Sequence, residues 1–196
     1  MKRSIFAAAV IMLCAAGCAR QAQTVDSTDF LKLATDRYSV RSFSPTPVDS
    51  AKVNLILRAG QVAPTAVNSQ PQKVYVANSE TVMAKLRQLS PCIYGAPQCF
   101  VFCYDDERVA ARGEQGNYGD IDVTIVLTHM MLEAQSLGVG TCIVGYFDAD
   151  RLTEALNLPA NLHPVLLMPF GYASDDAQPS PKHSSYRPLE ETVEFL

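Results

Sequence analysis

One segment restricts the fold of this chain more than any other, a run of apolar residues at helical spacing over 120–137. Apolar side chains fall on nearly every face of the helix that this spacing predicts, so we expect the helix to be buried all round. A long helix of this kind belongs at the centre of a packed domain. Its apolar members are Ile121, Ile125, Val126, Leu127, Met130, Met131, Leu132 and Leu137.

Helical and extended segments alternate along the rest of the chain. Apolar residues at helical spacing predict helices, and short apolar runs bounded by turn residues predict strands. Asp49 suits a helix N-cap, and Pro97 bounds the most apolar strand. Further helices are expected over 29–35, 50–61, 80–89 and 150–156, and strands over 73–77, 98–104, 141–144 and 165–172.

The first residues predict an export signal. Lys2 and Arg3 precede an apolar run over 5–16, and the small residues at 15–17 lead into Cys18. The run is shorter than the roughly 20 residues of a spanning helix, so a bacterial lipoprotein signal over 1–17, with Cys18 lipidated, is expected. A plain signal peptide cut elsewhere, with Cys18 incidental, is the alternative.

Size and charge set the rest of the organisation. Removal of 1–17 leaves 179 residues, enough for one domain over 29–196 behind a polar tether over 19–28. It also removes two of the 16 basic residues and none of the 20 acidic ones, which leaves a net charge of −6. Nucleic acid is therefore not an expected partner. We expect an exported protein of the bacterial cell envelope, held at a membrane by its lipid anchor only.

The first candidate site is Arg37-Tyr38-Ser39-Val40-Arg41, directly after the first predicted helix. Two guanidinium groups and a hydroxyl in an irregular stretch suit a phosphate dianion, because Arg donates from a rigid fork and keeps its charge. A solvated loop with surface charges explains the same residues.

The second candidate site, over 64–71, follows a predicted helix and precedes a strand. Asn68 and Gln70 can each donate and accept hydrogen bonds, which matches the edge of a flavin or a pyrimidine. An ordinary turn explains these residues equally well.

The third candidate site lies over 138–147. Gly145 follows a predicted strand, and its lack of a side chain lets a backbone N–H approach a planar ligand. The alternative is that Gly138 ends a helix and Gly145 makes a tight turn.

Four motifs occur in a fixed order, over 37–41, 63–71, 137–141 and 187–191. Together they resemble the FMN-dependent nitroreductase family, from about residue 30 to the end. The resemblance implies an α+β fold with a mostly antiparallel central sheet flanked by helices. It also implies a long buried central helix and an extended C-terminal tail exchanged in a homodimer.

The implied contacts to the cofactor phosphate agree with the residues themselves. Arg37, Tyr38, Ser39 and Arg41 match the family segment that holds the phosphate and ribityl chain of FMN. Arg187 matches a basic position near the C-terminus that contacts the same phosphate. The family usually has a second basic residue there, and Tyr186 stands in its place.

Other positions match residues around the flavin ring. Asn68, with Gln70 beside it, matches the residue that hydrogen-bonds the pyrimidine edge of the flavin. Val144 and Gly145 match positions whose backbone N–H groups lie near flavin N5. Gln72 stands where the family often has an aromatic residue, which predicts a more open pocket.

The resemblance implies that the site is shared between two subunits. Pro64 and Thr65 match positions that reach the FMN of the other subunit. The tail ends in the apolar residues Val193, Phe195 and Leu196, which are expected to lie on the partner.

The implied activity is transfer of an electron pair through flavin N5. The donor is a reduced nicotinamide or another small molecule, and the acceptor is a nitroaromatic, a quinone or a similar compound. A flavin-binding or flavin-storing lipoprotein with little turnover is the alternative, because an exported protein meets little NAD(P)H. An FMN-dependent oxidase or dehalogenase of the same fold and a flavin-free adhesin are further alternatives. No catalytic side chain is expected, because the flavin carries the chemistry.

The cysteines allow two interpretations. Cys92, Cys99, Cys103 and Cys142 are either small buried residues of the core or members of a disulfide in an oxidising compartment. Cys99 and Cys103 cannot pair with each other, because four residues of strand span roughly 13 Å. No spacing typical of a metal site occurs in the sequence.

Overall fold

Strand β2 (Gln98–Asp105) forms the centre of the sheet, as its apolar sequence predicts. The computed structural model describes residues 28–196. β2 pairs antiparallel with β1 (Gln72–Ala77) on one side and with β4 (Leu162–Gly171) on the other, and β4 also pairs antiparallel with β3 (Gly140–Thr141). The order β1-β2-β4-β3 makes one four-stranded antiparallel sheet, which confirms the expected α+β class.

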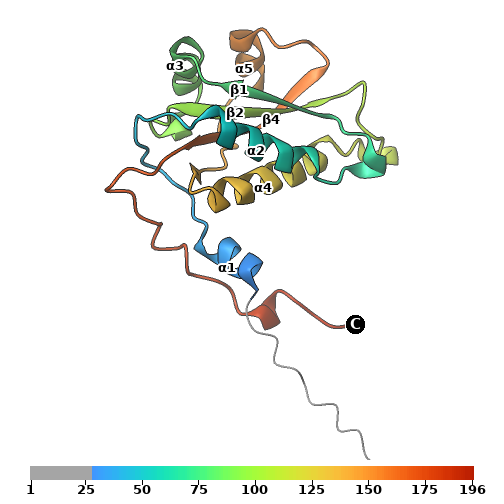
Figure 1. Cartoon of the computed structure of the whole chain (residues 1–196). Helices are drawn as coiled ribbons and strands as arrows, with labels where there is room; N and C mark the ends of the chain where they lie inside the picture. The colour runs from blue at the N-terminus through green and yellow to red at the C-terminus, as the bar shows by residue number, and fades with distance from the viewer. Residues whose placement is uncertain (1–27) are drawn as a thin grey trace, which may run out of the picture.

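Side chains of β2 alternate between the two faces of the sheet. Phe100 and Phe102 belong to one core cluster, whereas Cys99, Val101 and Cys103 belong to the other. All of these side chains are buried. Since a strand buried on both faces needs cover on both, the sheet is the middle of three layers (Figure 1).

Helices α2 and α4 cover one face of the sheet, and α3 and α5 cover the other (Figure 1). The helices begin and end within a residue or two of the predicted bounds. They are α1 (Asp29–Asp36), α2 (Ser50–Gln61), α3 (Glu80–Leu89), α4 (Gly119–Ser136) and α5 (Ala149–Leu156). Single 3-10 turns lie at η1 (Ala66–Asn68), η2 (Pro91–Ile93), η3 (Gly113–Gln115) and η4 (Leu189–Glu191).

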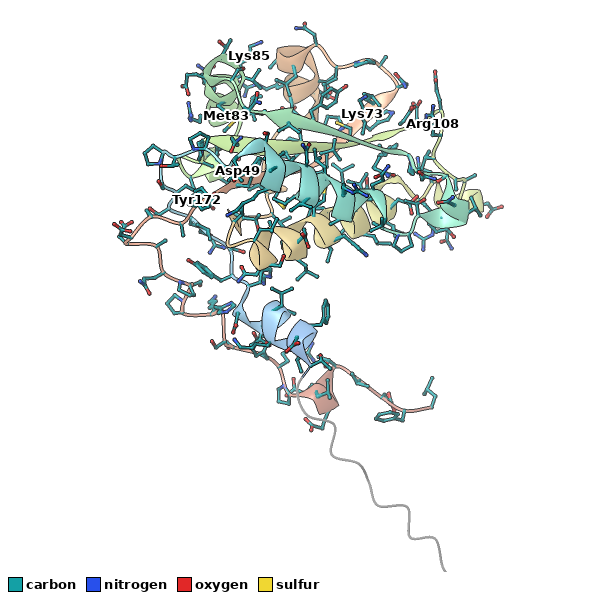
Figure 2. The ribbon with its side chains drawn as sticks, in the orientation of Figure 1. Asp49, Lys73, Met83, Lys85, Arg108 and Tyr172 are labelled. Carbon is teal, nitrogen blue, oxygen red and sulfur yellow. The ribbon has the colours of Figure 1, made fainter. Side chains whose placement is uncertain are left out.

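Polar side chains cap the starts of α1, α2, α3 and α5. The Asp49 carboxylate, at the start of α2 in Figure 2, accepts a hydrogen bond from the Lys52 N–H at 3.0 Å. It is therefore the N-cap that the sequence predicts. Ser79 caps α3 in the same way, and Met83, one turn later, is fully buried between α3 and the sheet (Figure 2).

Helix α4 is long and central, but the expectation that it is buried all round is wrong for the single chain. Its inner face packs against α2 and the sheet. Ile121 on the outer face is 42% exposed, because α2 and the sheet cover only one side of the helix. Residues three and four apart share a face, so Ile121, Thr124, Ile125 and Thr128 form an outward-facing α4 stripe.

The strand expected over 141–144 is interrupted. Regular pairing is limited to β3, and an isolated bridge joins Val144 to Leu167. Between them the Cys142 N–H donates to the Pro169 carbonyl at 3.2 Å, but Pro169 has no N–H with which to complete the ladder. Isolated hydrogen bonds therefore hold this end of the sheet, and the chain is free to turn away after Val144.

The two ends of the described chain extend away from the layered body. Helix α1 and the C-terminal segment from Ser174 onward lie to one side of the layers, beyond α4 (Figure 1). Phe30 of α1 is 63% exposed and Phe195 of the tail is 96% exposed. Both segments therefore present apolar side chains that the single chain does not cover.

The predicted signal over 1–17, the predicted lipidation site Cys18 and nearly all of the tether over 19–28 lie outside the described residues. None of the helices in residues 28–196 combines the length and the apolar character that a membrane crossing requires.

The four cysteines of residues 28–196 are free. Cys99, Cys103 and Cys142 are buried and Cys92 is half-buried, which agrees with their interpretation as core residues. Burial raises the pKa of the Cys103 thiol to about 12, and it raises the pKa of the Cys99 thiol as well.

These buried thiols predict a loss of stability at alkaline pH. The thiols ionise near pH 9.0 in the unfolded chain but only near pH 12 at Cys103 in the folded protein. The free energy of unfolding is therefore expected to fall as the pH rises from about 9 toward 12, with the full contribution present below pH 9. Urea unfolding at several pH values checks this. The Cys99→Ala/Cys103→Ala variant should show a flatter pH dependence, and an equally steep one would contradict the assignment.

Candidate functional site

The predicted phosphate-binding segment faces a hollow of about 360 Å³. We call it the basic hollow, because two arginines and a lysine line it and no acidic residue does. Its lining residues are Arg37, Tyr38, Ser39, Arg41, Ser180, Lys182 and His183. Lys182 and His183 come from the tail and were not predicted from the sequence. The only signal for them was that two basic residues are adjacent there.

The segment with Arg37 and Arg41 is hydrogen-bonded to β3, at the edge of the sheet. Ser39 forms a parallel bridge with Thr141, and the Val40 N–H donates to the Thr141 carbonyl at 2.9 Å. Val40 is 2% exposed, and a Cβ at Gly140 would lie 2.6 Å from its Cγ2 atom. Because side chains alternate along an extended segment, Ser39 and Arg41 point away from the buried Val40.

The charge of the basic hollow is not neutralised within the described chain. No carboxylate of residues 28–196 forms an ion pair with Arg37 or Arg41. Burial raises the pKa of the nearby Cys142 thiol, and the positive charges of Arg41 and Arg37 oppose that shift. Two guanidinium groups, an ammonium group and hydroxyls without a neighbouring acid form a donor set that fits a phosphate dianion.

The backbone at Gly145 differs from the expectation in one respect. The resemblance implies that Val144 and Gly145 both offer an N–H near flavin N5. In the structure the Val144 N–H donates to the Leu167 carbonyl at 2.9 Å, so it is not available. Gly145 is exposed, and its N–H has no partner within residues 28–196. Gly145 can therefore offer a free backbone donor here, whereas Val144 cannot.

The predicted loop over 64–71 has a strained backbone. Val67, Asn68 and Gln70 have φ values of 47°, 56° and 48°, in the left-handed region that a β-branched residue rarely adopts. The Thr65 hydroxyl accepts from the Gln70 N–H at 3.0 Å, and Gln70 Nε2 donates to Asn68 Oδ1 at 3.1 Å. Pro64 is exposed at the start of the loop. Strain concentrated in a few residues points to a functional loop.

A buried carboxylate anchors this loop. Asp122 of α4 is 1% exposed, and its Oδ1 accepts from the Ala66 N–H at 2.9 Å. Asp122 Oδ2, Ser69 Oγ and Gln72 Oε1 are the three buried side-chain polar atoms of residues 28–196 without a partner. Since buried polar groups are normally hydrogen-bonded, these three atoms in and around the loop are open to a partner from outside the single chain. Asp122 was not predicted; a carboxylate within an apolar helix was the signal for it.

Replacing Asp122 with alanine is expected to loosen the loop. The Ala66 N–H would lose a charged acceptor, which costs about 1–3 kcal/mol of the free energy of unfolding. Amide hydrogen exchange over 65–70 should accelerate accordingly. Asp122→Asn keeps an acceptor oxygen and should show a smaller effect. Equal amide hydrogen exchange in the alanine variant and the parent would show that the loop keeps its structure without Asp122.

Gln72 lines a second hollow. The hollow has a volume of about 690 Å³ and lies between α2, α4 and β1. Its lining residues are Asn54, Leu57, Arg58, Gly60, Gln61, Gln70, Gln72, Val74, Val126 and Met130. Because β1 is an edge strand, this hollow opens beside an unpaired strand edge.

The loop and the basic hollow do not meet in one chain. Helix α2 lies between them in the sequence, and its 12 residues span about 18 Å. The two segments lie at opposite ends of α2 in Figure 1. Arg187 does not line the basic hollow either, because its Nε donates to Glu191 Oε2 at 3.2 Å, farther along the tail. One chain therefore presents two separate parts of the predicted site.

Comparison with known proteins assigns the fold to a family. The model of the Nitroreductase family matches residues 34–92 and 85–172. The chain therefore belongs to the nitroreductase family. A crystal structure of a nitroreductase family protein from Clostridium difficile 630 superposes with a TM-score of 0.80 at 35% identity, over 86% of this chain and 98% of that one.

Two relatives have names that state an activity. An NADPH-dependent oxidoreductase of Staphylococcus epidermidis is 31% identical over 169 residues, which cover 77% of this chain and 67% of that protein. An FMN reductase (NAD(P)H) of Bacillus subtilis is 27% identical over 173 residues, which cover 79% of this chain and 70% of that protein.

Proposed function

We propose that this chain is an FMN-dependent oxidoreductase. It passes an electron pair from a reduced nicotinamide, or another small donor, to a nitroaromatic, a quinone or a similar acceptor. Membership of the nitroreductase family and the names of the two relatives support the reaction class. The observation that carries the proposal is the basic hollow. Ser39, which lines it, forms a bridge with Thr141, four residues before Gly145 in the chain.

The residues of this chain bind and orient the cofactor. Arg37, Arg41 and Lys182 would hold the FMN phosphate, and Gly145 would offer its free N–H to the ring. Bound FMN would supply an atom, N5, that accepts and releases an electron pair. Because donor and acceptor use the same exposed face in turn, the kinetics are expected to be ping-pong.

The complete site requires a second copy of the chain. The α4 stripe, α1 and the tail expose apolar side chains, which a homodimer would bury. The loop over 64–71 of one copy would then complete the FMN site of the other. The tail of the partner, with Val193 and Phe195 alternating with Glu194, suits the unpaired edge of β1 and the nearby Arg58.

The sequence of the first residues supports export, with a lipid on Cys18 as the anchor. This location favours a second candidate function, a lipoprotein that binds or stores flavin with little turnover, because an envelope protein meets little NAD(P)H. The same basic hollow would serve both functions.

An absorbance spectrum of the purified protein, followed by anaerobic addition of NADPH, tests these alternatives. Yellow protein that bleaches supports the reductase, whereas yellow protein that stays oxidised favours flavin storage or another donor. An FMN-dependent oxidase or dehalogenase would be identified by its substrate profile. Protein that is colourless and does not take up added FMN would rule out flavin chemistry and leave a flavin-free adhesin.

A further inference from the structure

Ser90 is a buried polar residue between α3 and η2. It is 1% exposed and follows the last residue of α3, where its N–H donates to the Leu86 carbonyl at 3.0 Å. Its hydroxyl donates to the Tyr146 carbonyl at 2.7 Å and accepts from the Cys92 N–H at 3.2 Å. Ser90 therefore ties the rigid end of a helix to the segment that follows Gly145.

This hydrogen bond fixes one particular peptide unit. Ser90 holds the carbonyl end of the unit between Tyr146 and Phe147. The other end, the Phe147 N–H, donates to the Gly145 carbonyl at 3.3 Å. The unit is thus held at both ends, and it holds the carbonyl side of Gly145.

The other side of Gly145 is held by the sheet. Val144 exchanges two hydrogen bonds with Leu167, each 2.9 Å long. Gly145 therefore lies between two anchored neighbours while its own N–H stays free. Glycine has no side chain to restrict its dihedral angles, and Tyr146 is 73% exposed. Only Phe147 of this turn packs against the core, so hydrogen bonds must orient the peptide units before it. Loss of either anchor would let the N–H change direction.

We propose that Ser90 is a positioning residue for the flavin, and that its hydroxyl holds the turn over 145–147 so that the free Gly145 N–H faces flavin N5. The proposal rests on the proposed function. Ser90 acts on the ring through Tyr146 and Gly145, and it leaves the phosphate contacts in the basic hollow unchanged. Its replacement should therefore alter the properties of the flavin ring more than the affinity for FMN.

The first test needs no cofactor. Ser90→Ala removes one oxygen atom, and Ser79→Ala at the other end of α3 is the matched control, because Ser79 accepts only from the Val82 N–H at 3.4 Å. Exchange of the Phe147 amide, whose N–H donates to the Gly145 carbonyl, should accelerate about tenfold in Ser90→Ala. It should not change in Ser79→Ala, and thermal unfolding of each variant shows that the domain is intact.

The second test uses the FMN-loaded full chain. We expect FMN affinity to stay within a few-fold in Ser90→Ala, and the midpoint potential of the flavin to rise by about 30 mV, a tenfold change for a two-electron couple. The rise follows because N5 accepts a hydrogen bond only in the oxidised ring and carries a proton after reduction. A fixed donor therefore favours the oxidised form. Ser90→Thr keeps the hydroxyl and should restore the potential.

The outcomes separate this proposal from the proposed function. Failure of the parent protein to bind FMN overturns both. An unchanged potential in Ser90→Ala protein that binds FMN overturns only the role of Ser90. Unchanged exchange of the Phe147 amide also overturns it, because the turn would then be held without the Ser90 hydroxyl.

Discussion

The double variant Arg37→Ala/Arg41→Ala is expected to bind FMN about a thousandfold more weakly than the parent protein. Each guanidinium would lose charge-assisted hydrogen bonds to the phosphate, at a cost of about 2 kcal/mol. Each single variant should therefore lose about 30-fold, and the two losses together give the thousandfold figure. Titration of flavin fluorescence measures the affinity directly. Raised salt should weaken the parent more than the double variant, because charge drives the contact.

Arg87→Ala is the matched control for this experiment. Arg87 is an exposed arginine on α3 that pairs with Glu80 and lies outside the basic hollow. Its replacement should leave FMN affinity unchanged. Arg37→Lys keeps a charge without the guanidinium fork, so its FMN affinity should lie between those of the parent and Arg37→Ala. If the double variant bound FMN as tightly as Arg87→Ala, the basic hollow would not be the phosphate site.

Mixing two inactive variants is expected to restore FMN binding. One variant carries Arg37→Ala/Arg41→Ala, and the other carries Thr65→Ala/Asn68→Ala in the strained loop. If each site combines the hollow of one chain with the loop of the other, every mixed dimer contains one intact site. Random pairing of equal amounts makes half of the dimers mixed, so about a quarter of all sites should be restored.

Co-expression of the two variants with different tags, followed by tandem purification, isolates the mixed dimer. Its flavin content should then be about one FMN per two chains. The parent protein with the same two tags is the control for purification. A mixed dimer without flavin, beside a parent that binds it, would show that each site is built from one chain.

Most of the fold could be predicted because hydrophobic spacing reports the local structure of a segment. The helix expected over 80–89 matches α3 residue for residue, and α4 differs by one residue at each end. The prediction that the outer face of α4 is buried was wrong for the single chain, because the sequence shows which residues are apolar but not what covers them. The strand over 141–144 was too long because Pro169, which breaks its ladder, lies on the neighbouring strand.

Only part of the candidate site could be predicted from the sequence. Arg37, Ser39 and Arg41 are close in sequence, so their shared chemistry is visible without a structure. Lys182 and His183 join them only because the tail folds back beside α1, which no local pattern reports. Asp122 and Ser90 act through hydrogen bonds to distant backbone groups, and their residue types alone do not reveal this.

Pro169 lowers the stability of the sheet, so selection for stability alone would not favour it. It lies in β4, between two neighbouring strands, and deprives the ladder of one hydrogen bond. A residue with an N–H at this position would allow β3 to continue as a regular strand through Val144 and would strengthen the sheet. A longer, flatter edge would also hold the following glycine closer to the sheet. A stabilising substitution at Pro169 would therefore change the path of the chain into Gly145, and stability gained at a functional edge of this kind often comes with a loss of activity.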